Sequence, residues 1–318
     1  MHTNNPNLNT YNSISQYNSN KKAIVTIGTF DGVHVGHRKI LERIIHSAQE
    51  LDCNSVVLTF FPHPKMVLQE GSDVKLLNTI DEKINLLEST GIDSLIIHPF
   101  DKEFSRLTAE EFVKEILIDK LHIQKIIIGY DHRFGRNRTA DINDLIHYGK
   151  EYGFEVEQIS AQEINDNTVS STKIRTTILE GKSTLAKEYL GYNYFFSGTV
   201  VKGKQLGRTI GFPTANICIK EDYKLTPKNG VYIVKGTCNK ETLFGMMNIG
   251  TRPTVYGENQ TIEVHFFDFD KDIYNQHITI EILEFIRDEH KFESLDNLKN
   301  QIQKDKEFSI NHLNNSVF

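Results

Sequence analysis

The segment Gly28–His37, which reads GTFDGVHVGH, constrains the fold and chemistry of this chain more than any other. It directly follows the apolar run Ala23–Ile27. It directly precedes a helical pattern whose apolar face carries Ile40, Leu41, Ile44, Ile45, Ala48 and Leu51. Where a helix directly follows a strand, the first backbone N–H groups of the helix are free and lie at the positive end of its dipole. Glycines there let a phosphate approach closely, and histidines add donors, so the segment predicts a nucleotide-handling site.

Composition limits the other functions open to the chain. Its 318 residues are enough for two domains, and its net charge of −6 argues against a nucleic-acid partner. No apolar run approaches the roughly 18 residues of a membrane span. Residues 1–20 are rich in Asn and Ser and lack the apolar core of a secretory signal, so we predict a disordered tail. Cys53, Cys218 and Cys238 fit reduced thiols in a cytoplasmic protein.

Short apolar runs alternate with helical patterns from residue 21 to about 160, which predicts a parallel sheet covered by helices. The predicted strands are 23–28, 55–60, 94–98, 125–129 and 154–159, and the predicted helices are 36–52, 81–90, 108–121 and 141–152. Ligands of such sheets bind beyond the carboxyl ends of the strands. The motif-bearing ends are those after Ile27, Phe60 and Ile128.

The pattern changes near residue 190. Five predicted strands, 194–201, 230–236, 243–249, 261–269 and 277–283, follow one another before a helix at about 294–306. Successive strands separated by turn residues predict an antiparallel barrel with a terminal helix. We therefore expect an α/β chain with a first domain at 21–186 and a second at 187–310.

The two histidines of the first motif allow three interpretations. They can be structural residues at a helix start, or zinc ligands, although no third ligand stands out. They can also stabilise the charge on an α-phosphate while pyrophosphate leaves, which needs positioning and charge neutralisation and no covalent nucleophile. The glycine frame and the preceding strand favour the third interpretation.

Two later segments support a phosphate site. Gly129–Arg138 places three arginines in a glycine loop after a predicted strand, and Val169–Arg175 places hydroxyl groups at a predicted helix start. Alone, the first would be a solvated surface loop and the second an ordinary N-cap. Together, hydroxyls, free N–H groups and arginines can hold a triphosphate.

The first half resembles the nucleotidyltransferase superfamily marked by His-x-Gly-His, and within it the FMN adenylyltransferase module of bacterial bifunctional riboflavin kinase/FAD synthetases. Residues 28–37, 59–64, 129–138 and 170–175 carry the resemblance, and Ala140 departs from it. The resemblance implies a Rossmann-like fold with His34 and His37 as catalytic residues. It implies nucleotide contacts at Gly28, Thr29, Phe30, Asp31, Gly36, Gly129, Asp131, Arg138, Ser171, Thr172 and Arg175. It implies flavin contacts at Phe61, His63 and Pro64.

Three features stand out in the second half. Residues 198–204 nearly match a P-loop, but Gln205 replaces the Ser or Thr that would bind magnesium, so we reject a P-loop. The glycine-rich stretch 207–216 offers neutral oxygens at Thr214 and Asn216, which suit Mg²⁺ beside phosphate or simply cap a turn. Glu263 lies beside aromatic residues on an alternating strand, where it is either solvated or a general base.

Residues 194–306 resemble the riboflavin kinase module. The carrying segments are 198–216, 229–232, 248–254, 262–269 and 285–292, and the departures are Gln205, Leu206 and Asn275. The resemblance implies Glu263 as catalytic base, Thr214 and Asn216 near magnesium, and flavin contacts at Arg287 and Glu289. It implies nucleotide contacts at Gly203, Lys204, Gly207 and Gly211.

Together the resemblances imply a bifunctional enzyme that makes FMN from riboflavin and ATP, and then FAD and pyrophosphate from FMN and a second ATP. The expected partners are these small molecules and Mg²⁺, without nucleic acid or membrane, and a homo-oligomer stays open. Two alternatives remain at this point. The first domain could transfer a nucleotide to another phosphate, or the protein could be a flavin-binding regulator with inactive sites.

Overall fold

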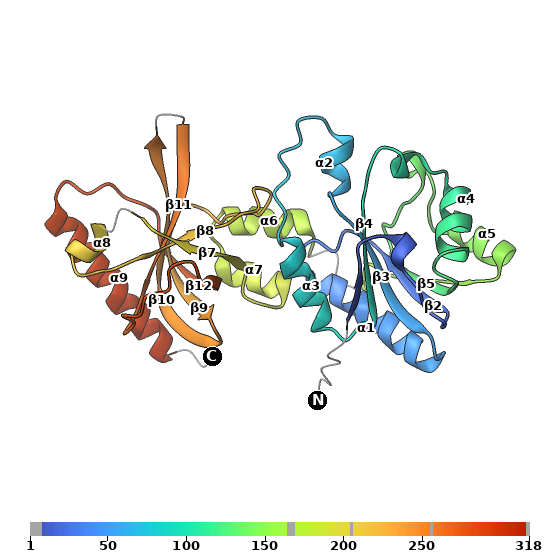
Figure 1. Ribbon diagram of the computed structural model, residues 1–318, viewed down its shortest axis with the longest axis horizontal. Coiled ribbons are helices and arrows are strands. Elements are labelled where there is room, and N and C mark those ends of the chain that lie inside the picture. The colour runs from blue at the N-terminus through green and yellow to red at the C-terminus, as the bar shows by residue number, and fades with distance from the viewer. Residues whose placement is uncertain (1–7, 164–168, 204–205, 255–256, 316–318) are drawn as a thin grey trace. The chain divides into compact units, whose positions relative to one another are not determined.

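A computed structural model describes residues 8–163, 169–203, 206–254 and 257–315 (Figure 1). Its contacts divide the chain into two compact units between Ser171 and Thr172. This division falls earlier than the predicted boundary at 186/187. The reason is that helices α6 (Ser171–Leu179) and α7 (Ser183–Leu190) lead into the second unit, where α7 packs against strand β12 (His277–Arg287).

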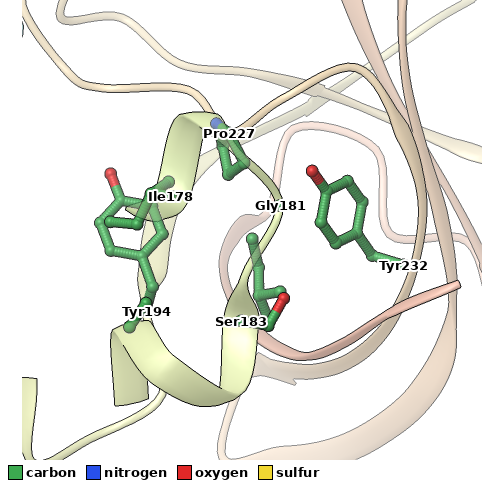
Figure 2. Close-up of a pocket in the computed structure, with 8 residues that line it drawn as sticks. Ile178, Gly181, Ser183, Tyr194, Pro227 and Tyr232 are labelled. Carbon is green, nitrogen blue, oxygen red and sulfur yellow. The ribbon is translucent and has the colours of Figure 1, made fainter. Parts of the chain in front are cut away.

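A small cavity shows how these helices pack on the barrel. Ile178, Ser183, Tyr194, Pro227 and Tyr232 line it, with Ile178 and Tyr194 on one side and Tyr232 on the other (Figure 2). The Tyr232 hydroxyl lies in this wall and donates a hydrogen bond to the Lys228 carbonyl. The packing is apolar and close, so the helix pair is part of the barrel unit.

The first unit contains a six-stranded sheet in the order β1-β4-β3-β2-β5-β6, and every described pair of neighbours is parallel. The strands are β1 Asn9–Tyr11, β2 Ala23–Ile27, β3 Asn54–Phe60, β4 Ser94–His98, β5 Ile123–Gly129 and β6 Glu155–Ile159. The predicted parallel-sheet domain is confirmed, and the five predicted strands agree with β2–β6 to within two residues.

Helices cover both faces of this sheet (Figure 1). Side chains alternate across a strand, so Ile24 packs in the core with helix α1 while Val25 packs in the opposite core with Phe112 and Leu145. The helices are α1 Val35–Glu50, α2 Pro64–Leu68, α3 Ile80–Glu88, α4 Ala109–Glu111, a π-helical stretch η3 Phe112–Ile118 and α5 Ile142–Tyr152, with short 3₁₀ turns at Ile14–Gln16, Phe104–Arg106 and Arg136–Arg138.

The predicted disordered tail over residues 1–20 is wrong for the part of it that the structure describes. Strand β1 extends the sheet by pairing with β4, and Ile14 and Tyr17 are only 3% and 8% exposed. The Ile14 N–H donates to His98 Nδ1, and the Asn54 amide donates to the Tyr17 hydroxyl. Edge pairing satisfies backbone groups whatever the side chains are, so an Asn-rich segment joins the sheet with few apolar residues. Residues 1–7 lie outside the described part.

The second unit contains a closed barrel in the order β10-β11-β8-β7-β12-β9, with antiparallel pairs throughout its described strands. Its remaining strands and helices are β7 Phe195–Val201, α8 Leu206–Thr209, β8 Ala215–Cys218, β9 Gly230–Cys238, β10 Glu241–Thr254, β11 Gly257–Phe266 and α9 Leu295–Asn315. The predicted barrel and terminal helix are confirmed. Strand β8 was not predicted, because its four residues follow a glycine- and proline-rich stretch.

The buried N-terminal segment makes a stability prediction. Ile14→Ala should lower the free energy of unfolding of the first unit by about 2–4 kcal/mol, because it leaves a cavity beneath β1. Chemical denaturation followed by circular dichroism measures the change. Asn18→Ala, at an exposed position in the same segment, is the matched control. Equal stability of both variants would contradict the placement of Ile14 in the core.

Candidate active sites

The loop between β2 and α1 holds the His-x-Gly-His motif in a strained backbone. Phe30 has a φ of 46° and Val33 a φ of 37°, values that L-residues rarely adopt. The fully buried Asp31 carboxylate accepts a hydrogen bond from the Leu77 N–H at 2.9 Å. The Thr29 carbonyl accepts two, from Lys83 Nζ at 2.7 Å and from Thr59 Oγ1 at 3.2 Å. These bonds offset the backbone strain and fix the loop at the carboxyl end of the sheet.

His34 and His37 stack on one another at the start of α1. Their ring centroids lie 3.6 Å apart with planes inclined by 16°. The His37 N–H donates to His34 Nδ1 at 3.3 Å, so His34 caps the helix and its neutral ring carries the proton on Nε2. Burial lowers the pKa of His34 to about 4, and burial lowers the pKa of His37 well below 6.5. Both rings are therefore neutral donors at neutral pH.

Lys83 is the main feature of this site that the sequence analysis missed. Its side chain is only 3% exposed, and burial lowers its pKa to about 8 against the opposing effect of Asp31. The charge of Lys83 also disfavours a proton on His37. One signal could have revealed this lysine: it lies four residues before the buried Leu87, on the apolar face of α3.

The structure brings some of the predicted nucleotide contacts to this loop. The Ser171 hydroxyl, at the first residue of α6, donates to the Asp31 carbonyl at 2.9 Å.

The other predicted nucleotide contacts lie at nearby strand and helix ends. Gly129 ends β5, which pairs with β2, and a side chain on it would come within 3.8 Å of the Asp131 carboxylate. A side chain at Gly28 would meet the Phe30 ring, and Gly36 is buried in the first turn of α1. Arg138 is exposed with a φ of 56°. Thr172 and Arg175 follow Ser171 within α6.

His132, in the loop after β5, is a further histidine that is largely enclosed. Its Nε2 is buried without a hydrogen-bond partner, and burial lowers its pKa to about 4. Its ring lies parallel to Phe134 at a centroid distance of 6.3 Å. This histidine is therefore neutral at neutral pH, with its ring beside that of Phe134.

The predicted flavin residues of the first unit surround a short helix. His63 caps α2 by accepting a hydrogen bond from the Lys65 N–H at 3.1 Å, and Pro64 occupies the first helical position. Phe61 packs partly buried against the core that contains α1. On the adjacent strand end, Phe60 lies against Phe100 and Phe104 at centroid distances of 5.6 and 5.4 Å. The segment thus presents aromatic rings at the same sheet edge as the histidines.

The barrel places three polar side chains in one row. Glu263 on β11 lies opposite Asn216 on β8 and opposite Asn248 on β10. Directly opposed residues share a face, and all three are half-buried while their neighbours Val264 and Met247 fill the interior. Asn248 was not among the predicted site residues, since it needs the register between β10 and β11 to be known.

The glycines next to this row leave room for its side chains. A side chain on Gly203 would overlap the Asn216 amide, with 2.2 Å between its Cβ and Asn216 Nδ2. A side chain on Gly207 would lie 2.2 Å from the Phe212 carbonyl oxygen. Gly211 has a φ of 88°, and Thr214 is the last residue before β8. Lys204, a predicted nucleotide contact, lies outside the described residues.

Arg287 and Glu289 take different positions after β12. The Arg287 guanidinium binds both carboxylate oxygens of Asp305 on α9, at 2.7–3.1 Å, and donates to the Asp288 carbonyl at 3.0 Å. Arg287 therefore anchors α9 in this structure, and its predicted flavin contact stays a prediction. The Glu289 carboxylate covers Gly250 on β10. A Cβ atom added to Gly250 would lie 2.2 Å from Glu289 Oε1.

A pocket of about 370 Å³ adjoins the polar row. Asn216 and Thr261 line it, together with Glu221, Lys224 and Gln260. Its size is within the range of small-molecule sites. Among the described residues, no group of three or more His, Cys, Asp and Glu side chains could hold a metal ion.

Comparison with known proteins identifies the family of each unit. The FAD synthetase family matches residues 16–173, and the riboflavin kinase family matches residues 190–313. The bifunctional riboflavin kinase/FMN adenylyltransferase of Buchnera aphidicola subsp. Schizaphis graminum is 39% identical over 300 residues, covering 93% of this chain and 95% of its own. The enzyme of the same description from Escherichia coli K12 is 37% identical, covering 89% and 90%. The chain therefore belongs to the bifunctional riboflavin kinase/FMN adenylyltransferase family, and the predicted resemblance is confirmed.

A solved structure supports the fold. A Streptococcus pneumoniae protein whose structure is titled a macrolide-efflux protein matches with a TM-score of 0.87 and 31% identity, covering 95% of this chain and 98% of that one. In the described ranges of our chain, no helix combines the length and apolarity needed to cross a membrane.

The enclosed His132 makes a pH prediction. The unfolded chain takes up a proton on this histidine below pH 6.5, whereas the folded chain does so only near pH 4. The free energy of unfolding should therefore decrease as the pH is lowered from 6.5 to 4, by up to about 1.4 kcal/mol per pH unit for this group. Urea unfolding of wild type and His132→Phe from pH 7 to 4.5 tests it, and the variant should lose less stability. The exposed His46→Phe serves as the control. Parallel curves for His132→Phe and wild type would contradict the assignment.

The Arg287–Asp305 ion pair makes a second prediction. Asp305→Asn leaves a guanidinium that is 18% exposed without its carboxylate, so the barrel unit should lose about 3 kcal/mol of unfolding free energy. Thermal denaturation measures the loss, and Asp296→Asn at the exposed start of α9 is the matched control. A loss no larger than that of the control would show that the pair does not anchor α9.

Proposed function

We propose that the two units of this riboflavin kinase and FMN adenylyltransferase each catalyse one of the two reactions. The first unit adenylylates FMN at the stacked histidines, and the barrel phosphorylates riboflavin at the row of Asn216, Glu263 and Asn248. The observation that carries this assignment is the geometry of the His34–His37 pair, two neutral imidazoles at a helix start whose ring centroids lie 3.6 Å apart. The substrates are ATP, riboflavin and FMN, and the products are FAD, pyrophosphate and ADP.

In the adenylylation step, a phosphate oxygen of FMN attacks the α-phosphorus of ATP. The bond between the α-phosphorus and the oxygen that bridges to the β-phosphorus breaks, and pyrophosphate leaves with that oxygen. His34 Nε2 would donate to an α-phosphate oxygen as its charge rises. Because the loop is already fixed by Lys83 and Asp31, the donors need little reorganisation during the reaction.

The free N–H groups at the start of α1 and the arginines of the loop after β5 would balance the triphosphate charge. Ser171 already contacts the histidine loop, and Thr172 and Arg175 stay the predicted partners of the leaving phosphates. The aromatic rings around α2 would take the flavin of FMN, since rings of this kind stack on flat aromatic ligands.

In the kinase step, Glu263 would remove the proton from the ribityl 5′-hydroxyl while that oxygen attacks the γ-phosphorus of ATP and ADP leaves. Thr214 and Asn216 fit a magnesium site, because they offer neutral oxygens and the Asn216 amide fills the space above Gly203. Mg²⁺ would supply charge neutralisation at the ATP phosphates when bound. The adjoining pocket has room for a substrate ring.

We also propose that the protein works in the cytoplasm with small molecules as its partners. Its three cysteines are unpaired, and Cys53 and Cys238 have thiol pKa values that burial raises. Such thiols are poor nucleophiles and suit a reducing compartment.

A pair of variants tests this assignment of the two reactions. His34→Ala should lower FAD formation from FMN by about 10²–10³-fold and leave FMN formation unchanged, because it removes a donor from the first site alone. Glu263→Ala should lower FMN formation by about 10²–10⁴-fold and leave FAD formation from supplied FMN unchanged. Chromatography of the flavins after incubation with ATP and MgCl₂ measures both.

His46→Ala and Glu241→Ala are the matched controls, since both side chains are about half-exposed or more. His46 lies on α1, as His37 does, and Glu241 lies on β10, which pairs with the strand of Glu263. If either site variant abolished both activities in a folded protein, the assignment of separate sites would be wrong. If another phosphate compound is the natural acceptor of the nucleotide, it should compete with FMN for the first site. Flavin binding without ATP turnover would indicate a regulator.

A further inference from the structure

His265 lies next to the kinase site without a role so far. It follows Glu263 by two residues on β11, so both side chains are on the same side of the strand. Its side chain is only 8% exposed. Its ring packs edge-on against Phe212 and Phe267 at centroid distances of 5.4 and 6.0 Å. The imidazole is thus enclosed between the strand and the loop that precedes β8.

One hydrogen bond joins this ring to that loop. His265 Nδ1 lies 2.8 Å from the Pro213 carbonyl oxygen. The carbonyl can only accept, so Nδ1 must carry the proton. The other nitrogen, Nε2, is buried and has no hydrogen-bond partner. The neutral ring with its proton on Nδ1 is therefore the form that satisfies this site.

The bond continues a strand ladder beyond its end. Strand β8 pairs with β11 at Asn216–Glu263 and at Ala215–Val264. The second pair is the last one on the side of Pro213. Proline has no N–H, so its carbonyl is the one backbone group that Pro213 can offer in such a ladder. The imidazole supplies the donor in place of a backbone N–H and holds the chain just before Thr214.

Residues 207–212, the loop before Pro213, are held together by hydrogen bonds within the loop. The Phe212 N–H donates to the Gly207 carbonyl at 2.8 Å. The Ile210 and Gly211 N–H groups close the loop further, onto the Gly207 and Arg208 carbonyls at 3.2 and 3.4 Å. The hydrogen bond from His265 ties this closed loop to the barrel. A shift of that hydrogen bond would move the Thr214 and Asn216 oxygens relative to the Glu263 carboxylate.

We propose that His265 is a positioning residue of the kinase site, whose Nδ1–H fixes the Pro213 carbonyl and thereby sets Thr214 and Asn216 against Glu263. This inference rests on the proposed kinase site. His265 touches no substrate in this account and transfers no proton. Its contribution is the alignment of groups that hold the ATP phosphates, and small misplacements of such groups have large kinetic effects.

Two variants separate the donor from the ring. His265→Phe keeps an aromatic ring but loses the donor, and should raise the KM for ATP and lower the kcat of FMN formation, about tenfold or more in kcat/KM. His265→Asn places an amide N–H near the position of Nδ1, and should stay within about threefold of wild type. Phe267→Leu removes the other ring contact, is the matched control, and should behave like wild type. FAD formation from supplied FMN should be equal in all four proteins.

The proton position has a readout that does not depend on activity. Long-range ¹H–¹⁵N spectra of the full chain with labelled histidine should show one signal with the proton on Nδ1, which disappears in His265→Phe. A proton on Nε2 would overturn the inference. So would wild-type kinetics in His265→Phe, or an Asn variant that is folded and as slow as the Phe variant. Absence of FMN formation by wild type would instead refute the proposed kinase site, while the spectra would still decide the tautomer.

Discussion

In both units, backbone hydrogen bonds between strands decide which side chains meet. In the first unit, the parallel pairing of β2 with β3 and β5 brings three strand ends to one edge, and the His-x-Gly-His loop, the aromatic segment and the arginine loop all begin there. In the barrel, the register of β11 with β8 and β10 aligns Glu263 with Asn216 and Asn248. A slip by one residue would turn Glu263 into the barrel interior, so the register is part of each site.

The second physical theme is the burial of groups that can carry charge. His34, His37 and Lys83 are enclosed in the first site, and desolvation moves each of their pKa values toward the neutral form. The two rings therefore offer N–H groups and add little positive charge of their own. A bound triphosphate would reverse this balance, since a nearby anion favours protonation.

Sequence patterns predicted the sheet and the barrel, because the periods of apolar residues are local signals. They failed where the structure depends on distant pairing. Strand β1 is stabilised by its partner β4 and by the burial of Ile14, not by its own composition. Asn248 joins the site only through the strand register. The ion pair between Arg287 and Asp305, 18 residues apart on β12 and α9, was likewise not predicted. Lys83 was passed over because a lysine is seldom buried.

The most direct test of the account is a time course with purified protein, riboflavin, ATP and MgCl₂, with the flavins separated by chromatography. The account predicts that FMN appears first and FAD follows, with one ATP consumed for each step and pyrophosphate released only with FAD. FMN without FAD would contradict the role assigned to the stacked histidines. Riboflavin that stays unchanged while bound to the protein would contradict both catalytic assignments.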